Sequence, residues 1–167
     1  MAKQLNHYNT LLLKHNLSII LVCNYVSSPA NLGMIFRNAD AFGVEKIVLS
    51  PENVSFLAST RFKKIARNTA EQISHVVIET AEIQKQLQIY AKEDFQLVAL
   101  DFTSTSKAIH KLNFQTKVCI ILGHENSGIP NNLLSNIKTH AHIDLFGENS
   151  SINVAQALGI SLYEITK

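Results

Sequence analysis

The chain has 167 residues, of which 46% are hydrophobic and 17% are charged. This length and composition predict a single well-buried α/β domain spanning residues 1–167. The net charge of +2 excludes a strongly basic global field, so a site for a polyanion would need a local cluster of cations.

Short apolar runs alternate with helical patterns along the chain. The expected strands cover residues 18–23, 46–49, 75–78, 96–100, 117–122 and 140–145. The expected helices cover residues 29–42, 60–72, 79–92, 130–137 and 153–165. A turn is expected at residues 51–53, and a loop or short helix at residues 103–107. Residues 1–17 are expected to form an N-terminal helix or tail. The alternation predicts a mainly parallel six-stranded sheet with helices on both faces.

The cysteines and histidines give no sign of a disulfide or a metal site. Cys23 and Cys119 each lie in an apolar run without a metal-ligating neighbour, so we expect buried free thiols in a reducing compartment. His140 and His142 lie on one face of an expected strand, but no third ligand is near in sequence, and we expect no metal. With no leader peptide and no apolar run that approaches the roughly 18 residues of a membrane span, we expect a cytoplasmic protein without a membrane partner.

Three polar loops follow expected strands, and in parallel sheets ligands gather at the carboxyl ends of the strands. The first leads into a helix with Asn31 and Arg37, where an arginine offers a fork to phosphate or carboxylate, although it could equally be a solvent-facing residue. The second, residues 123–130, carries Glu125 between two glycines. The third, residues 147–151, is polar, and Ser150 or Ser151 is expected to cap the last helix.

Together the three loops form an ordered set of motifs. They read N-x-G-x-x-x-R from Asn31, G-x-E-x-x-G-I-P from Gly123, and I-x-L-x-G-x-x-x-S-x-N-V-A from Ile143. This set resembles the three motifs of the SpoU (TrmH) branch of the SPOUT RNA methyltransferases, over nearly the whole chain. The resemblance implies a C-terminal deep trefoil knot, S-adenosylmethionine as cofactor and a homodimer packed through the final helix.

The resemblance also implies roles for individual residues. The implied cofactor-binding residues are Leu100, Gly123, Ile143, Leu145, Ser151, Ile152 and Asn153. The implied catalytic residues are Arg37, Asn31, Glu125, Ser151 and Asn153. An arginine normally stays protonated, so Arg37 acts either as an unusual general base or, more conservatively, as a group that holds the RNA phosphate and stabilises developing negative charge.

An RNA partner requires cations on the surface. Residues 61–67 carry four of them, which form either a phosphate track together with Arg37 or a solvated helix face. These four candidate RNA-binding residues are Arg61, Lys63, Lys64 and Arg67. The resulting hypothesis is methyl transfer from S-adenosylmethionine to a ribose 2'-hydroxyl of tRNA or rRNA. A base methyltransferase and a non-catalytic RNA-binding or assembly protein are the alternatives.

Overall fold

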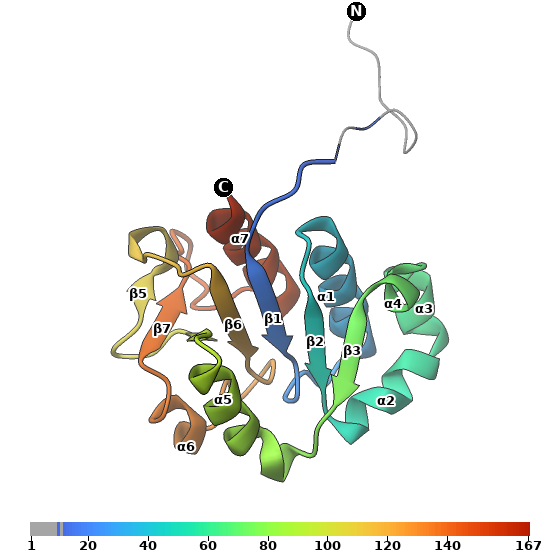
Figure 1. Ribbon diagram of the computed structural model, residues 1–167, viewed down its shortest axis with the longest axis horizontal. Coiled ribbons are helices and arrows are strands. Elements are labelled where there is room, and N and C mark those ends of the chain that lie inside the picture. Colours follow the sequence, from blue (N-terminus) through green and yellow to red (C-terminus); the bar gives the residue numbers. More distant parts are fainter. Residues whose placement is uncertain (1–9, 11) are drawn as a thin grey trace, which may run out of the picture.

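The computed structural model describes residue 10 and residues 12–167. Seven parallel strands form one sheet in the order β3-β2-β1-β6-β4-β7-β5 (Figure 1). The strands are β1 Ser18–Val22, β2 Lys46–Leu49, β3 Ser74–Val77, β4 Gln96–Leu100, β5 Lys107–Ala108, β6 Lys117–Leu122 and β7 Thr139–His142. The predicted α/β class and parallel sheet are therefore confirmed, whereas the predicted count of six strands is wrong.

The additional strand is β5, in a segment for which a loop or short helix was the prediction. Its two residues pair with β7, Lys107 with Ala141 and Ala108 with His142. Two residues are too short to produce the alternation by which a strand is recognised in a sequence. The same pairing explains why β7 ends at His142 and not at Leu145, since its neighbours β4 and β5 end at the same level.

Helices cover both faces of the sheet, as predicted. They are α1 Pro29–Ala41, α2 Pro51–Ala58, α3 Thr60–Ala66, α4 Thr69–Gln72, α5 Ile83–Lys92, α6 Asn131–Leu134 and α7 Val154–Thr166, with 3₁₀ turns η1 Thr80–Glu82 and η2 Ile109–Lys111. Buried side chains of α1, α3 and α7 join one apolar cluster, and those of α5 and α6 join the other. In Figure 1, α5 and α6 accordingly lie on the opposite side of the sheet from α1 and α7.

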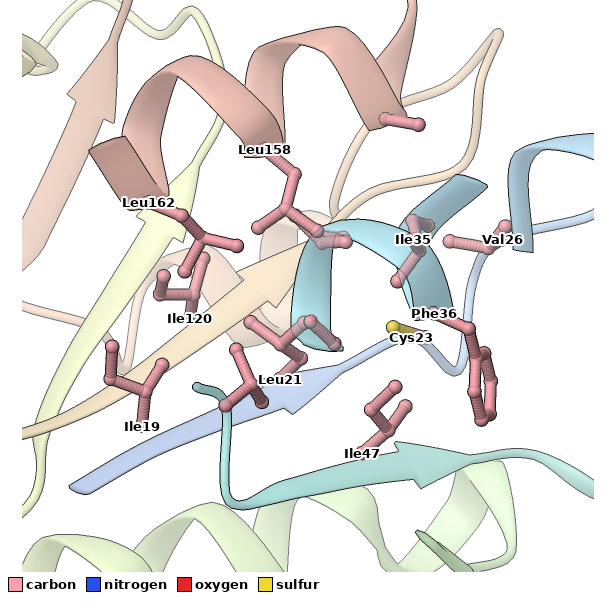
Figure 2. Packing of buried hydrophobic residues seen from close by; sticks show 14 of the residues in the cluster. Ile19, Leu21, Cys23, Val26, Ile35, Phe36, Ile47, Ile120, Leu158 and Leu162 are labelled. Carbon is pink, nitrogen blue, oxygen red and sulfur yellow. The ribbon is translucent and has the colours of Figure 1, made fainter. Parts of the chain in front are cut away.

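The larger cluster fixes α1 and α7 side by side on the central strands. Figure 2 shows Leu158 and Leu162 of α7 near Ile120 of β6, with Ile35 of α1 beside them. Asn38 of α1 adds a hydrogen bond to α7, because its Nδ2 donates to the carbonyl of residue 155 at 2.7 Å. The start of α7 is thereby held against the last third of α1.

The region between β2 and β3 differs from its prediction. Residues 51–53 start helix α2 instead of forming a turn, because Ser50 and Asn53 form a reciprocal capping box and Pro51 occupies the first helical position. The helix predicted over residues 60–72 is broken into α3 and α4 at Arg67, whose φ of 55° and ψ of −129° are incompatible with a helix.

Arg67→Gly should therefore stabilise the fold, since only glycine adopts this backbone conformation without strain. We expect about 1 kcal/mol, seen as a rise of about 2–4 °C in the melting temperature. Arg67→Ala is the matched control, because it removes the same side chain and charge but keeps the Cβ atom. Equal melting temperatures for the two variants would show that the backbone at Arg67 stores no strain.

The remaining expectations concern the cysteines and the N-terminal segment. Cys23 and Cys119 are buried free thiols, as predicted, and burial raises the pKa of both. Most of the helix or tail predicted over residues 1–17 lies outside the described residues, but Leu12 and Leu13 are exposed and belong to no helix. No helix in the described part of the chain is long and apolar enough to cross a membrane.

Candidate functional site

A cavity of about 530 Å³ lies at the carboxyl ends of β4, β6 and β7. It collects all seven predicted cofactor-binding residues, Leu100, Gly123, Ile143, Leu145, Ser151, Ile152 and Asn153. Two further predicted catalytic residues, Asn31 and Glu125, also line it. Three segments that are far apart in the sequence thus meet at one cavity, and their individual roles remain predictions.

A chain of side-chain hydrogen bonds joins the three motifs beside this cavity. Ser27 donates to Oε2 of Glu125 through its backbone N–H at 3.0 Å and its hydroxyl at 2.7 Å. Asn31 donates from Nδ2 to Oε1 of Glu125 at 2.8 Å, and Asn153 donates from Nδ2 to Oδ1 of Asn31 at 2.8 Å. Each motif therefore contributes one side chain to the same network.

The direction of this network is fixed by the N-terminus of α7. Oδ1 of Asn153 accepts from the backbone N–H groups of residues 155 and 156, at 2.9 and 3.3 Å, so its Nδ2 has to donate to Asn31. Asn31 in turn has to donate to Glu125. Asn153 is thus the N-cap of α7, and the prediction that Ser150 or Ser151 caps this helix is wrong.

Glu125 is held as an ionised acceptor. Partial burial raises the pKa of its carboxyl, but hydrogen bonds from Ser27 and Asn31 outweigh burial and leave the pKa below its ordinary value. A carboxylate with a lowered pKa and three donors on its two oxygens is a poor general base. In this geometry, Glu125 connects the second loop to α1 through hydrogen bonds.

Asp101, which sequence reasoning did not single out, fixes the other side of the second loop. Its Oδ2 accepts the N–H of Ile129 at 2.8 Å, and its Oδ1 accepts the N–H of Phe102 at 2.8 Å. A Cβ atom on Gly128, which has a φ of +67°, would lie 2.5 Å from Asp101 Oδ2. The available signal was a carboxylate directly after the predicted strand 96–100, at the end where ligands bind.

Gly123 is required by backbone packing within the same loop. A Cβ atom there would lie 2.5 Å from the carbonyl carbon of Gly128 and 2.7 Å from the nitrogen of Ile129. Both neighbours are backbone atoms, and the loop is closed by two hydrogen bonds between His124 and Gly128 of 2.9 and 3.0 Å. A larger residue at position 123 would have to displace the loop that carries Glu125.

Gly123→Ala should accordingly destabilise the protein by about 1–3 kcal/mol, the typical effect of an overpacked site. Gly147→Ala is a matched control from the third loop, where a Cβ atom would meet nothing within 4 Å. Thermal denaturation of both variants measures the difference. Identical melting temperatures would contradict the close approach at Gly123.

The structure does not place Arg37 at this cavity. Arg37 lies six residues after Asn31, which is about 9 Å further along α1, and its side chain is exposed. It follows Gly33 by one helical turn, and Gly33 packs against Ile65 of α3. Arg37 therefore lies on the side of α1 that faces α3 and solvent.

The predicted RNA-binding cations lie on α3 or at its end, and α3 packs against α1. α3 packs on α1 through Phe62, whose ring makes an edge contact with Phe36 at a centroid distance of 5.3 Å. The four cations of this segment are all exposed and none lines the cavity; they are Arg61, Lys63, Lys64 and Arg67. The candidate RNA-binding residues, Arg37 included, thus lie on α1 and α3, outside the cavity.

The two histidines of β7 have separate hydrogen-bond partners. Nδ1 of His140 lies 3.0 Å from the hydroxyl groups of Thr103 and Thr105. His142 lies between Ser106, at 2.9 Å, and Asp144, at 3.3 Å. Among the described residues, no group of three or more histidine, cysteine or acidic side chains is arranged to hold a metal ion.

The family model of the SpoU rRNA methylases matches residues 18–163, which is most of the chain and includes all three motifs. The chain belongs to the SpoU rRNA methylase family. This result confirms the family suggested by the three motifs, and it accounts for the convergence of those motifs at one cavity.

Named relatives of this SpoU family member act on RNA. The chain is 30% identical to the 23S rRNA (guanosine-2'-O-)-methyltransferase of Vibrio vulnificus, over 99% of this chain and 66% of that protein. It is also 30% identical to the tRNA (guanosine(18)-2'-O)-methyltransferase of Saccharomyces cerevisiae, over 89% of this chain and 10% of that protein. The chain thus spans less than two thirds of the length of these curated relatives.

Solved structures share the fold. The AdoMet-bound rRNA methyltransferase of Sinorhizobium meliloti superposes with a TM-score of 0.76 at 24% identity, over 91% of this chain and 56% of that one. AdoMet is S-adenosylmethionine, the cofactor implied by the motifs. At this level of identity, the likeness establishes the fold of this SpoU family member.

Proposed function

We propose that this SpoU family protein transfers a methyl group from S-adenosylmethionine to a ribose 2'-hydroxyl of tRNA or rRNA. The observation that carries the proposal is the hydrogen-bond network from Ser27 through Glu125 and Asn31 to Asn153, which joins the three family motifs around one cavity. The names of the relatives support the same reaction on RNA.

The cavity suits S-adenosylmethionine in size, shape and charge. Its volume of about 530 Å³ falls in the usual range for small-molecule sites. Leu100, Ile143, Leu145 and Ile152 offer apolar walls for a purine ring. Among the described residues that line the cavity there are two carboxylates, Asp101 and Glu125, and no lysine or arginine, which suits a cationic sulfonium ligand.

The protein's own part in the reaction is to bind and to align. S-adenosylmethionine, when bound, supplies an already activated methyl group. A ribose hydroxyl is a weak nucleophile, so the site has to hold it in line with that methyl group and support the loss of its proton. Ser151 lines the cavity and is exposed, so its hydroxyl is available to substrate, whereas Asn31 and Glu125 are held in the network.

Arg37 serves as the group that holds an RNA phosphate. Arg37 is exposed, it lies well along α1 from Asn31, and it is on the side of the helix next to α3. All three observations favour this role over that of general base. Phosphates bound at Arg37 and α3 would place the adjoining nucleotide next to the motif network.

RNA binding at this surface should depend steeply on salt. Each cation that neutralises a phosphate releases counterions, so replacing Lys63 or Lys64 by Ala should lower the slope of log K against log salt by about one. Filter binding of total RNA at several salt concentrations measures that slope. Lys92→Ala, which removes an exposed lysine at the end of α5, is the control. A slope that falls equally in the control would contradict a phosphate track on α3.

We also propose the family's higher-order features for this chain. The final helix α7 buries one face in the core, and it leaves Ile160 and Tyr163 47% and 65% exposed, which suits a homodimer contact with a second copy. The path from α6, on one face of the sheet, to α7, on the other, suits a C-terminal trefoil knot. We place the protein in the cytoplasm, in keeping with its free buried thiols.

Transfer of tritium from labelled S-adenosylmethionine to total RNA, followed by nucleoside analysis, tests the proposal. We expect label in a 2'-O-methylated nucleoside, whose adjoining phosphodiester resists alkali because the attacking hydroxyl is blocked. Label in a methylated base would identify a base methyltransferase. RNA binding without transfer would identify a non-catalytic binding protein.

A further inference from the structure

A second cavity, of about 680 Å³, adjoins the first and contains none of the predicted site residues. Its walls come from the loop after β4, from residues 126–129 and from α6. Four residues line both cavities and form the wall between them; they are Asp101, Phe102, Asn126 and Gly128. A ligand in the second cavity would therefore lie directly beside the cofactor.

Both sides of this cavity are held in place by hydrogen bonds. Asp101 fixes the shared wall, since its two oxygens accept the N–H groups of Phe102 and Ile129, each at 2.8 Å. On the far side, Nε2 of His140 lies 3.1 and 2.9 Å from the carbonyl oxygens of Leu134 and Ile137, so it carries a proton. Nδ1 of His140 then accepts from the hydroxyl groups of the β4 loop.

The groups left open to a ligand include one aromatic ring, two carboxamides and the hydroxyls of Ser104 and Ser127. Phe102 is 69% exposed at the rim, with its ring edge-on to His142 at 4.8 Å. In the described part of the chain, the side chains of Asn126 and Asn131 make no hydrogen bond, so each offers a donor and an acceptor. The described lining contains no lysine or arginine, and the one acid, Asp101, disfavours a phosphate.

We propose that the second cavity receives the unpaired base of the target nucleotide, with Phe102 stacked on the base and Asn126 and Asn131 at its hydrogen-bonding edges. A nucleobase is neutral and planar, with an apolar face and a polar edge, and proteins read unpaired RNA bases by stacking and by amide contacts. The ribose of that nucleotide would then lie over the shared wall, next to the methyl donor. The inference rests on the proposed function.

The chain contains no tryptophan, so Phe102→Trp introduces a single fluorescent reporter at the proposed stacking position. Titration with total tRNA and with oligouridylate, in the presence of S-adenosylhomocysteine, should quench this reporter saturably, because a stacked base quenches indole. Phe146→Trp is the control, since Phe146 is 98% exposed in the loop after the neighbouring strand β7 and lines neither cavity. Equal quenching of both reporters by RNA would overturn the proposal.

Phe102→Ala gives an independent measurement in the methyl-transfer assay. Because Phe102 also lines the first cavity, the KM for total RNA is measured at saturating S-adenosylmethionine, where loss of one base–aromatic stack should raise it about tenfold or more. Phe102→Tyr keeps a stacking ring and should restore the KM. An unchanged KM for RNA in Phe102→Ala would contradict a base site. Quenching of Phe102→Trp without any methyl transfer by the wild type would contradict only the proposed function.

Discussion

Exchanging the amide and the carboxylate of the Asn31–Glu125 pair should restore a site that either single substitution breaks. Asn31→Asp places a second carboxylate against Oε1 of Glu125, where Nδ2 of Asn31 now donates at 2.8 Å. Glu125→Gln places two amide donors against each other, and Asn31 cannot turn over because Asn153 donates to its Oδ1. Each single change should cost about 1–3 kcal/mol of stability and lower methyl transfer about 100-fold.

In the double variant the donor and the acceptor of this one bond change places, and every other bond is kept. The carboxylate of Asn31→Asp still accepts from Asn153, and the carbonyl oxygen of Glu125→Gln still accepts from Ser27. A double-mutant cycle in melting temperature and transfer rate measures the coupling. Glu148→Gln removes a carboxylate from the third loop, outside the network, and should change neither quantity. Additive losses in the double variant would refute the network.

Arg37→Ala should lower methyl transfer by roughly 100-fold or more and leave the affinity for S-adenosylmethionine unchanged. Arg37 does not line the cavity, so its removal takes away a phosphate contact that positions the ribose and no cofactor contact. Arg37→Lys keeps the positive charge but loses the paired N–H donors of the guanidinium, so it should recover the rate only in part.

Arg61→Ala is the matched control, because it removes an equally exposed arginine from α3. It should weaken RNA binding most at low salt and leave the rate at saturating RNA unchanged. A wild-type rate in Arg37→Ala would refute the role of Arg37. A loss of cofactor affinity in the same variant would show that Arg37 belongs to the cofactor site instead.

Much of the fold follows from local patterns in the sequence. The strands at 46–49, 96–100 and 117–122 match their predicted bounds because each is an apolar run followed directly by a polar residue or glycine. The cavity residues were predicted from the resemblance of the three motifs to the SpoU (TrmH) family. They meet because these motifs follow parallel strands, whose carboxyl ends lie at one edge of the sheet.

The features that were not predicted have physical causes that no local sequence pattern reveals. Residues 60–72 contain neither glycine nor proline, so no strong helix breaker in the sequence indicates the positive φ of Arg67. Asp101 accepts a hydrogen bond from Ile129, which is 28 positions away, and Ser27 donates one to Glu125, which is 98 positions away. Arg37 was grouped with Asn31 by its motif, but six helical residues separate the two along and around α1.

Calorimetric titration of the purified chain with S-adenosylmethionine tests most directly whether the three loops build a methyl-donor site. We expect saturable heat with one site per chain, competition by S-adenosylhomocysteine, and weaker binding in Gly123→Ala but not in Gly147→Ala. A protein that melts cooperatively and yet gives no heat with the donor would contradict the account.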